Sequence, residues 1–157
     1  MTEADFRSLA DRLQARYAAA IDDDRLEDWP ALFADPCRYE ITTAENFEAK
    51  LPLGLFFADS RAMLNDRVAS LRRANIYEAQ RYRHIVSATQ VLESKPGRIA
   101  TQSNFLVVRI MLDGEMRIFA SGRYRDVIDL SGAEPLFAEK IAILDNRRID
   151  TLLALPI

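Results

Sequence analysis

The sequence predicts an α+β fold, in which N-terminal helices pack against the concave face of a strongly curved antiparallel sheet. Two observations support this. Apolar residues recur at helical spacing in the first half of the 157-residue chain, and three turn signals divide the second half into four extended runs. Long antiparallel strands coil strongly, so we expect an open-ended cone. The length, with 49% hydrophobic and 29% charged residues, fits a single domain over residues 1–157.

Three helical segments are expected. Thr2 and Asp5 resemble a capping pair, and the apolar positions that follow predict an amphipathic helix over about 3–22. Pro30 has no backbone N–H, so it breaks the short helical segment that comes next. A helix over about 60–75 begins at a serine that can cap it. The helices therefore precede most of the strands.

One strand and one segment without a clear period lie between these helices. Apolar and polar residues alternate over 37–42, which predicts a half-buried strand. The next stretch, 43–58, contains the apolar run 51–57, which is unusual for a solvated loop. We expect this run to form a surface covered within the fold or by another chain.

The second half reads as a meander of four strands. The turn signals that separate them are Pro96-Gly97, Asp113-Gly114 and Ser131-Gly132. The strands are expected at about 82–93, 98–112, 115–130 and 136–146. Gly122, alone inside the third of these runs, predicts a bend or bulge that helps the sheet curl around the helices.

The chain has one histidine, His84, and one cysteine, Cys37, which limits its chemistry. A structural zinc site needs four Cys or His ligands, and an iron–sulfur cluster needs four thiolates or two thiolates and two imidazoles. The chain cannot hold these groups alone. Cys37 also stands at the expected start of a strand, where a small apolar residue is ordinary. We therefore expect no metal, cofactor or nucleophilic cysteine in this chain.

His84 is the natural centre of an acid–base site. Strict alternation puts it on one face with Tyr82, and beside Tyr39 and a carboxylate such as Asp22 or Asp126 it could perform general acid–base catalysis near neutral pH. A dehydratase or isomerase can be built in this way. The alternative is structural: His84 donates to a backbone carbonyl in a partly buried network and titrates nothing useful.

Arginine pairs and an apolar chain end suggest contacts with other subunits. Arginine has a planar fork that suits carboxylates across an interface. Apolar chain ends are usually docked, either closing the core or forming an oligomer interface. The candidate interface residues are Leu53, Phe56, Phe57, Arg72, Arg73, Arg147, Arg148, Leu155 and Ile157.

Charge and apolar content exclude other classes of partner. The formal net charge of −3 argues against non-specific nucleic-acid binding, which relies on a surplus of Lys and Arg. No apolar run approaches membrane-spanning length. We expect no signal peptide, because the N-terminus is acidic and lacks a positive region followed by an apolar stretch. A single cysteine fits a reducing compartment, so the cytoplasm is expected.

The whole chain, from the first helix to the last residue, resembles the small (beta) subunits of Rieske-type aromatic-ring-hydroxylating dioxygenases. Within this family, the chain most resembles the branch that acts on benzoate-like acids such as salicylate, anthranilate and terephthalate. No single segment is a catalytic fingerprint, and the order of the segments makes the resemblance specific. The segments are the acidic run and Trp-Pro pair within 22–33, residues 59–67, residues 71–77 with Arg72-Arg73, Tyr82-Arg83-His84, Ala120-Ser121-Gly122-Arg123-Tyr124, and residues 150–157.

The resemblance implies the cone fold of nuclear transport factor 2 and ketosteroid isomerase (NTF2-like). It also implies a mostly structural subunit of an oxidoreductase. The large (alpha) subunit would carry a Rieske 2Fe–2S cluster and a mononuclear Fe(II), and the small subunits would form a trimer in a hexamer of three large and three small subunits. Electrons would come from NADH through a reductase and sometimes a ferredoxin. The reaction would give a cis-dihydrodiol or hydroxylate the ring of a benzoate-like acid.

Two functions therefore stand side by side. One is a non-catalytic subunit that assembles and stabilises the large subunits. The other is an autonomous acid–base enzyme of the same fold, with His84, Tyr39 and Asp22 as its catalytic residues. The pocket that would set the substrate of the first lies in another chain, so this sequence does not choose among aromatic acids.

Overall fold

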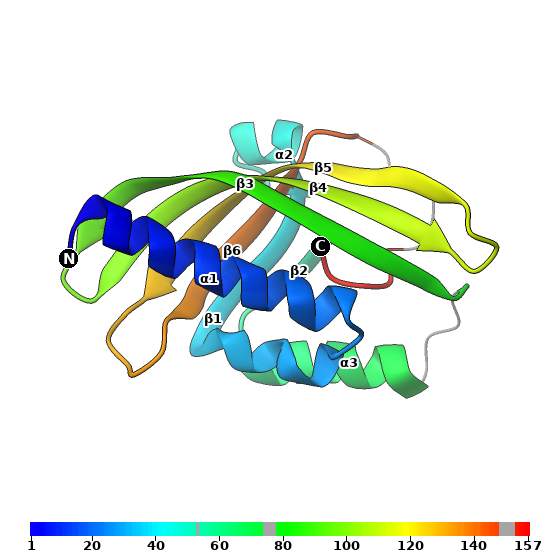
Figure 1. Cartoon of the computed structure of the whole chain (residues 1–157), viewed down its shortest axis with the longest axis horizontal. Helices are drawn as coiled ribbons and strands as arrows, with labels where there is room; N and C mark the ends of the chain where they lie inside the picture. The colour runs from blue at the N-terminus through cyan, green and yellow to red at the C-terminus, as the bar shows by residue number, and fades with distance from the viewer. Residues whose placement is uncertain (53, 74–77, 148–152) are drawn as a thin grey trace.

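A computed structural model describes residues 1–52, 54–73, 78–147 and 153–157. One six-stranded sheet, in the order β2-β1-β6-β5-β4-β3, curves around the helices (Figure 1). The elements are α1 (Glu3–Asp22), the 3-10 turns η1 (Leu26–Asp28) and η2 (Pro30–Leu32), β1 (Phe33–Thr43), α2 (Ala44–Glu48), β2 (Phe56–Ala58), α3 (Arg61–Arg73), β3 (Gln80–Lys95), β4 (Arg98–Met111), β5 (Met116–Asp129) and β6 (Leu136–Leu144).

The first helix forms as the sequence predicts. The side chain of Thr2 accepts from the backbone N–H of Asp5, and the Asp5 carboxylate accepts from the backbone N–H of Thr2 at 2.7 Å, so two groups that a helix end leaves unpaired are satisfied. The inward face of α1 includes Leu13, Tyr17 and Ile21, which are buried, and α1 crosses the concave side of the sheet (Figure 1). Each such side chain contributes about 1.5–3 kcal/mol on burial.

The four long strands and their turns are confirmed. Gly97 and Gly114 adopt positive φ angles of 74° and 89°, the conformation that only glycine takes without strain, at the two predicted hairpin turns. The pairing shifts by a residue between Val107 and Val108, where β5 bulges, and again after Ser87 in β3. These bulges increase the local twist and help the sheet curl.

The sheet differs from the prediction in one respect, because it is mixed. β1 and β6 run parallel, with Tyr39 opposite Lys140, while the other neighbours are antiparallel. Alternation along a strand gives its period and its buried face but not its direction, so the sequence could not settle this. β1 also begins at Phe33, four residues before the predicted strand start at position 37.

The region without a clear period contains two short elements. Thr43 caps α2 by accepting from the backbone N–H of Asn46 at 3.2 Å, and β2 adds an edge strand to β1, pairing Phe57 with Glu40. Helix α3 begins after Ser60, whose hydroxyl accepts from the backbone N–H of Met63, as the capping prediction required. The fold thus uses β2 to cover the edge that β1 would otherwise expose.

An aromatic cluster fills the cone. Tyr17 makes edge contacts with Trp29, Phe33 and Phe137, with ring centroids 5.7–6.5 Å apart, and Tyr39 packs on Trp29 at 5.2 Å. Edge-to-face pairs of this kind stabilise a core by about 0.5–1.5 kcal/mol each beyond the area they bury. The cluster joins α1, the 3-10 turns, β1 and β6 into one core.

Gly122 has a different role from the one predicted. The bulge in β5 lies at residues 118–120, and Gly122 itself pairs regularly with Phe105 and Leu144. A Cβ atom at position 122 would overlap the backbone carbonyl of Ile143 on β6. Glycine is therefore needed because two backbones approach closely, not because the strand bends there.

We expect Gly122→Ala to destabilise the fold by about 2 kcal/mol or more, since β5 and β6 must separate to admit the methyl group. Gly132→Ala is the matched control, because its nearest atom would be 3.8 Å away and its φ is not positive. Urea denaturation of both variants measures the difference. Equal midpoints for the two variants would contradict this account.

Candidate functional site

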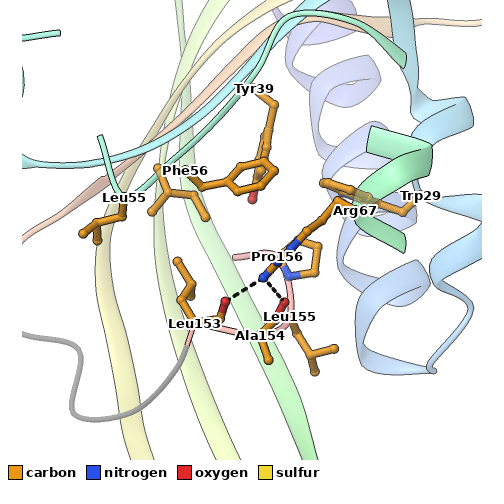
Figure 2. A pocket seen from close by; sticks show the side chains of 10 residues that line it. Trp29, Tyr39, Leu55, Phe56, Arg67, Leu153, Ala154, Leu155 and Pro156 are labelled. Atoms are coloured by element: carbon orange, nitrogen blue, oxygen red, sulfur yellow. Dashed lines mark hydrogen bonds between the residues drawn. The ribbon is translucent and has the colours of Figure 1, made fainter. Parts of the chain in front are cut away.

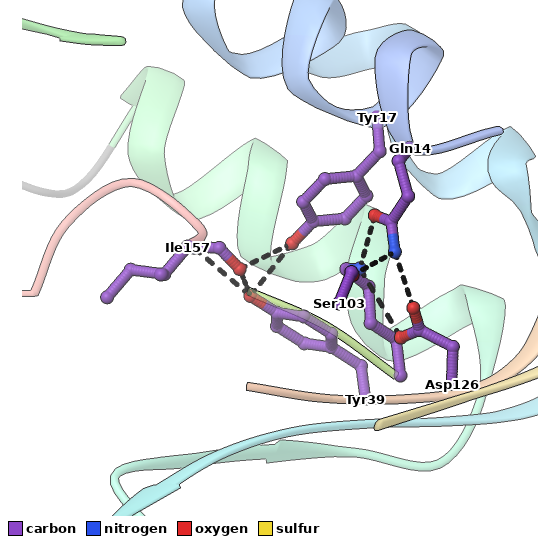
Figure 3. Close-up of polar contacts among 7 residues, drawn as sticks. Gln14, Tyr17, Tyr39, Ser103, Asp126 and Ile157 are labelled. Atoms are coloured by element: carbon purple, nitrogen blue, oxygen red, sulfur yellow. Dashed lines mark hydrogen bonds and ion pairs between the residues drawn. The ribbon is translucent and has the colours of Figure 1, made fainter. Parts of the chain in front are cut away.

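The interior of the cone is polar at one point, where Lys140 is completely buried. Its Nζ donates to Gln14 Oε1 at 2.8 Å and lies 3.4 Å from Asp126 Oδ1. The amide of Gln14 donates in turn to Asp126 Oδ2 at 2.5 Å and to Ser103 Oγ at 3.2 Å (Figure 3). Helix α1 and three neighbouring strands thus meet in one hydrogen-bonded group, the Lys140 network.

Aromatic rings surround the ammonium group of Lys140. The rings of Tyr124, Tyr17 and Phe137 have centroids 3.5, 4.4 and 4.5 Å from Nζ. Ring faces attract a desolvated cation. Burial nevertheless lowers the pKa of Lys140 to about 8, although Asp126 opposes the shift. Burial also raises the pKa of the Asp126 carboxyl, again opposed by its partner. Desolvation therefore favours the neutral form of both groups.

His84 pairs with Asp22, as one version of the acid–base hypothesis predicted. Its Nδ1 lies 2.6 Å from Asp22 Oδ1, and its backbone N–H donates to Asp22 Oδ2 at 2.8 Å. Both side chains are almost completely buried. The second ring nitrogen, Nε2, is buried and has no hydrogen-bond partner. The carboxylate therefore fixes the imidazole at the end of α1, but the nitrogen that would act on a substrate does not reach solvent.

The other predicted catalytic residues have different partners. The hydroxyl of Tyr39 is hydrogen-bonded to Tyr17 and to Ile157, and Asp126 belongs to the Lys140 network. Tyr17 contacts both groups, because its ring lies 6.3 Å from that of His84 and its hydroxyl lies 3.2 Å from that of Tyr39. The structure thus brings Asp22 to His84, and it ties Tyr39 and Asp126 to other parts of the core.

The chain's own final residues occupy part of the interior. The hydroxyls of Tyr17 and Tyr39 lie 2.7 and 3.1 Å from the carbonyl oxygen of Ile157, and the Ile157 N–H donates to Tyr39 at 3.2 Å (Figure 3). Burial raises the pKa of Tyr39 to about 12, so its hydroxyl stays protonated. Arg67 Nη2 donates to the carbonyls of Leu153 and Ala154 at 2.8 and 2.9 Å (Figure 2).

A cavity of about 250 Å³ remains beside this C-terminal segment, residues 153–157. Most of its wall is apolar or aromatic, and Arg67 supplies its charge (Figure 2). The lining residues are Trp29, Tyr39, Ile41, Leu55, Phe56, Arg67, Leu153, Ala154, Leu155 and Pro156. This cavity and the Lys140 network were not predicted from the sequence.

The predicted interface residues are spread over several environments. Phe57, Arg73 and Arg147 are exposed, whereas Phe56 lines the cavity and Arg72 pairs with Asp24 and Glu27 of the same chain. Leu53 and Arg148 lie outside the described residues.

Leu155 and Ile157 lie inside the fold of this chain. They are 6% and 0% exposed, because backbone groups of the C-terminal segment bond to Tyr17, Tyr39 and Arg67 inside the fold. In this chain the apolar end closes the core, and a role for these two residues at a subunit interface stays a prediction.

The described residues do not fit a metal centre or a nucleophilic cysteine. Among them, no group of three or more His, Cys, Asp or Glu could hold a metal ion, and Asp22 already binds the one imidazole. Burial raises the pKa of the Cys37 thiol, which is the opposite of the shift that activates a nucleophile. No helix in the described part of the chain is long and apolar enough to cross a membrane.

We expect Lys140→Met to destabilise the fold by about 3 kcal/mol or more, because it leaves Asp126 buried without its cation. The double variant Lys140→Met/Asp126→Asn should recover much of this loss, since Asn still accepts from Gln14 without a charge. Urea denaturation at pH 7 compares the variants. A double variant as unstable as the sum of the two single variants would contradict this coupling.

The pKa of Lys140 also predicts a dependence of stability on pH. An unfolded lysine has a pKa near 10.4, so between pH 8 and about 10 the unfolded chain binds more protons than the folded chain. The contribution of Lys140 to the free energy of unfolding therefore rises with pH in that window. The free energy of unfolding of the wild type, minus that of Lys140→Met, should increase from pH 7.5 to 9.5. A constant difference would refute the assigned shift.

Comparison with known proteins gives the chain its family. A sequence profile described as "ring hydroxylating beta subunit" matches residues 16–151. The chain is 41% identical to the anthranilate 1,2-dioxygenase small subunit of Burkholderia cepacia, over 92% of this chain and 90% of that protein. It is also 41% identical to a beta subunit of the terephthalate 1,2-dioxygenase terminal oxygenase component of Comamonas sp, over 91% and 93%.

A solved structure agrees with this match. The crystal structure of the beta subunit of a proposed aromatic-ring-hydroxylating dioxygenase from Novosphingobium aromaticivorans superimposes with a TM-score of 0.88. The two chains are 38% identical, and the alignment covers 96% of each. The predicted NTF2-like cone and the predicted resemblance are both confirmed. This chain belongs to the family of ring-hydroxylating dioxygenase beta subunits, and it is a subunit of an oxidoreductase.

Proposed function

We propose that this chain is the non-catalytic small subunit of a multicomponent Rieske non-heme iron oxygenase. It assembles and stabilises large subunits that oxidise a benzoate-like aromatic acid. The observation that carries the proposal is the interior of the cone. Its buried polar side chains bond to one another in the Lys140 network, or to the chain's own C-terminal segment through Tyr17 and Tyr39, where an enzyme of this shape would present such groups to a substrate.

Exposed apolar side chains support a role in assembly. Three residues on the outer face of the sheet, Ile85, Met116 and Ile118, are 51%, 68% and 70% exposed. The register places Ile118 opposite Val108 and Met116 opposite Ile110, while Ile85 lies opposite Leu106, two residues before Val108 on β4. These residues therefore lie close together on one face of the sheet. Phe57, at the other edge of the sheet, is also half-exposed. Contiguous exposed apolar surface is typical of protein interfaces.

The chemistry of the complex would reside in its other components. The large subunit would carry the Rieske cluster and mononuclear iron, with NADH as the electron source through a reductase and in some systems a ferredoxin. The small subunits would form the trimer of a hexamer in the cytoplasm. The similar proteins named for anthranilate and terephthalate support an aromatic acid as the substrate of this complex.

Co-expression tests this proposal. The chain, produced with the large subunit encoded beside it, should co-purify as a defined complex that contains iron and hydroxylates an aromatic acid. Ile118→Asp and Phe57→Asp should each reduce recovery of the complex roughly tenfold, because a buried unpaired charge costs more than 1.4 kcal/mol. Leu92→Asp is the matched control, since Leu92 is 45% exposed and lies outside the patch around Ile118 and away from Phe57. Full activity of the large subunit without this chain would refute the assembly role.

A second candidate function follows from the Asp22–His84 pair. An aspartate bound to Nδ1 leaves Nε2 as the acceptor of an acid–base catalyst, and the fold supports an autonomous dehydratase or isomerase on that basis. The burial of Nε2 counts against it. If the isolated chain turned over a small molecule and lost that activity in His84→Ala, this second function would replace the first.

A further inference from the structure

The cavity beside the C-terminal segment has the composition of a ligand site. Three aromatic side chains, from Trp29, Tyr39 and Phe56, form part of its wall (Figure 2). The Tyr39 ring lies 5.2 Å from that of Trp29 and 5.6 Å from that of Phe56, and the three rings are inclined to one another. Inclined rings present both edges and faces, which suits a further flat ring packed against them.

Arg67 provides one positive charge in this wall. Its Nη2 is used by the carbonyls of Leu153 and Ala154, and its guanidinium lies 5.5 Å from the centre of the Phe56 ring. Among the described residues no carboxylate forms an ion pair with Arg67, whose partners there are these two carbonyls and the Phe56 ring. A half-buried guanidinium in an apolar wall is costly unless an anion or water binds it. Arg67 is therefore suited to a ligand carboxylate.

The volume limits the size of the ligand. Pockets for drug-sized molecules enclose about 300–1,000 Å³. A cavity of about 250 Å³ therefore suits a molecule with a single ring. Leu55, which is 53% exposed, belongs to the wall and marks where the cavity meets solvent.

We propose that this cavity binds a small aromatic monocarboxylate, with its ring among Trp29, Tyr39 and Phe56 and its carboxylate against Arg67. This binding does not require a large subunit, so the proposal goes beyond the assembly role. The two proposals can be tested independently of each other. The ligand would also contact residues 153–156, and it would therefore stabilise the C-terminal segment in its docked position.

Trp29 is the only tryptophan of the chain, so its fluorescence reports on the cavity directly. Phenylacetate serves as the probe and 2-phenylacetamide as its neutral isostere. Titrating the full chain with phenylacetate should change the Trp29 emission saturably, with a dissociation constant of about 1 mM or lower. The amide should bind at least tenfold more weakly, because it lacks the charge that Arg67 recognises.

Two variants test the assigned geometry. Arg67→Met should weaken phenylacetate binding at least tenfold, and Arg73→Met, on the same helix and exposed, should leave it unchanged. Because Arg67→Met also releases two carbonyls, Leu55→Glu provides a second test that leaves the core intact. It should weaken binding severalfold by repelling the anion, whereas Met63→Glu, at an exposed residue outside the cavity, should not.

Three results would overturn the proposal. One is the absence of a saturable change up to 20 mM phenylacetate, taken as roughly twentyfold above the expected constant. Another is equal affinity for the acid and the amide, the outcome expected if the cavity instead receives an apolar side chain of another protein. The third is phenylacetate binding that neither Arg67→Met nor Leu55→Glu weakens.

Discussion

The buried ammonium of Lys140 is the constraint on which the interior depends. A lone cation in a protein core is prohibitively costly, so each group that faces it has to compensate. Asp126 supplies the opposite charge, Gln14 connects that carboxylate to α1, and the rings of Tyr124 and Tyr17 surround the remaining surface of the ammonium. Helix and sheet are thereby fixed in one relative position.

The same interior supports the proposed non-catalytic role. Tyr17 is bonded to Ile157, which belongs to the C-terminal segment, and Asp22 holds His84 so that its free nitrogen is buried. Polar groups that would bind or protonate a substrate are thus used to hold the protein together. Several large apolar side chains, in contrast, are exposed on the outside of the fold.

Much of the fold was predictable because local signals carry it. The capping pair at Thr2 and the turns at Gly97 and Gly114 depend on residues within a few positions, and all three were found where predicted. The direction of β1 relative to β6 depends on chain segments about a hundred residues apart, and no local pattern encodes it. Gly122 was noticed for the wrong reason, since the backbone that crowds it belongs to another strand.

The site was harder to predict. The pairing of His84 with Asp22 was proposed from residue chemistry alone, and the structure brings the two together. Gln14 could have been found, because it shares the buried face of α1 with Ala10 and Tyr17. Lys140 gave no signal, since a lysine in a strand usually points to solvent. Arg67 resembled the other arginines of its helix, and only the course of the C-terminal segment sets it apart.

The bond between Tyr39 and Ile157 spans 118 positions of the sequence. Folding must therefore wait for residues far along the sequence, because the parallel β1–β6 pair needs β6 and the docked segment needs residues 153–157. During synthesis the aromatic cluster would stay incomplete until Phe137 of β6 is available to pack on Tyr17 and Phe33. Such distant contacts slow folding and prolong the exposure of apolar surface. Early encounter with a partner subunit would shorten that exposure, which links the order of synthesis to the order of assembly.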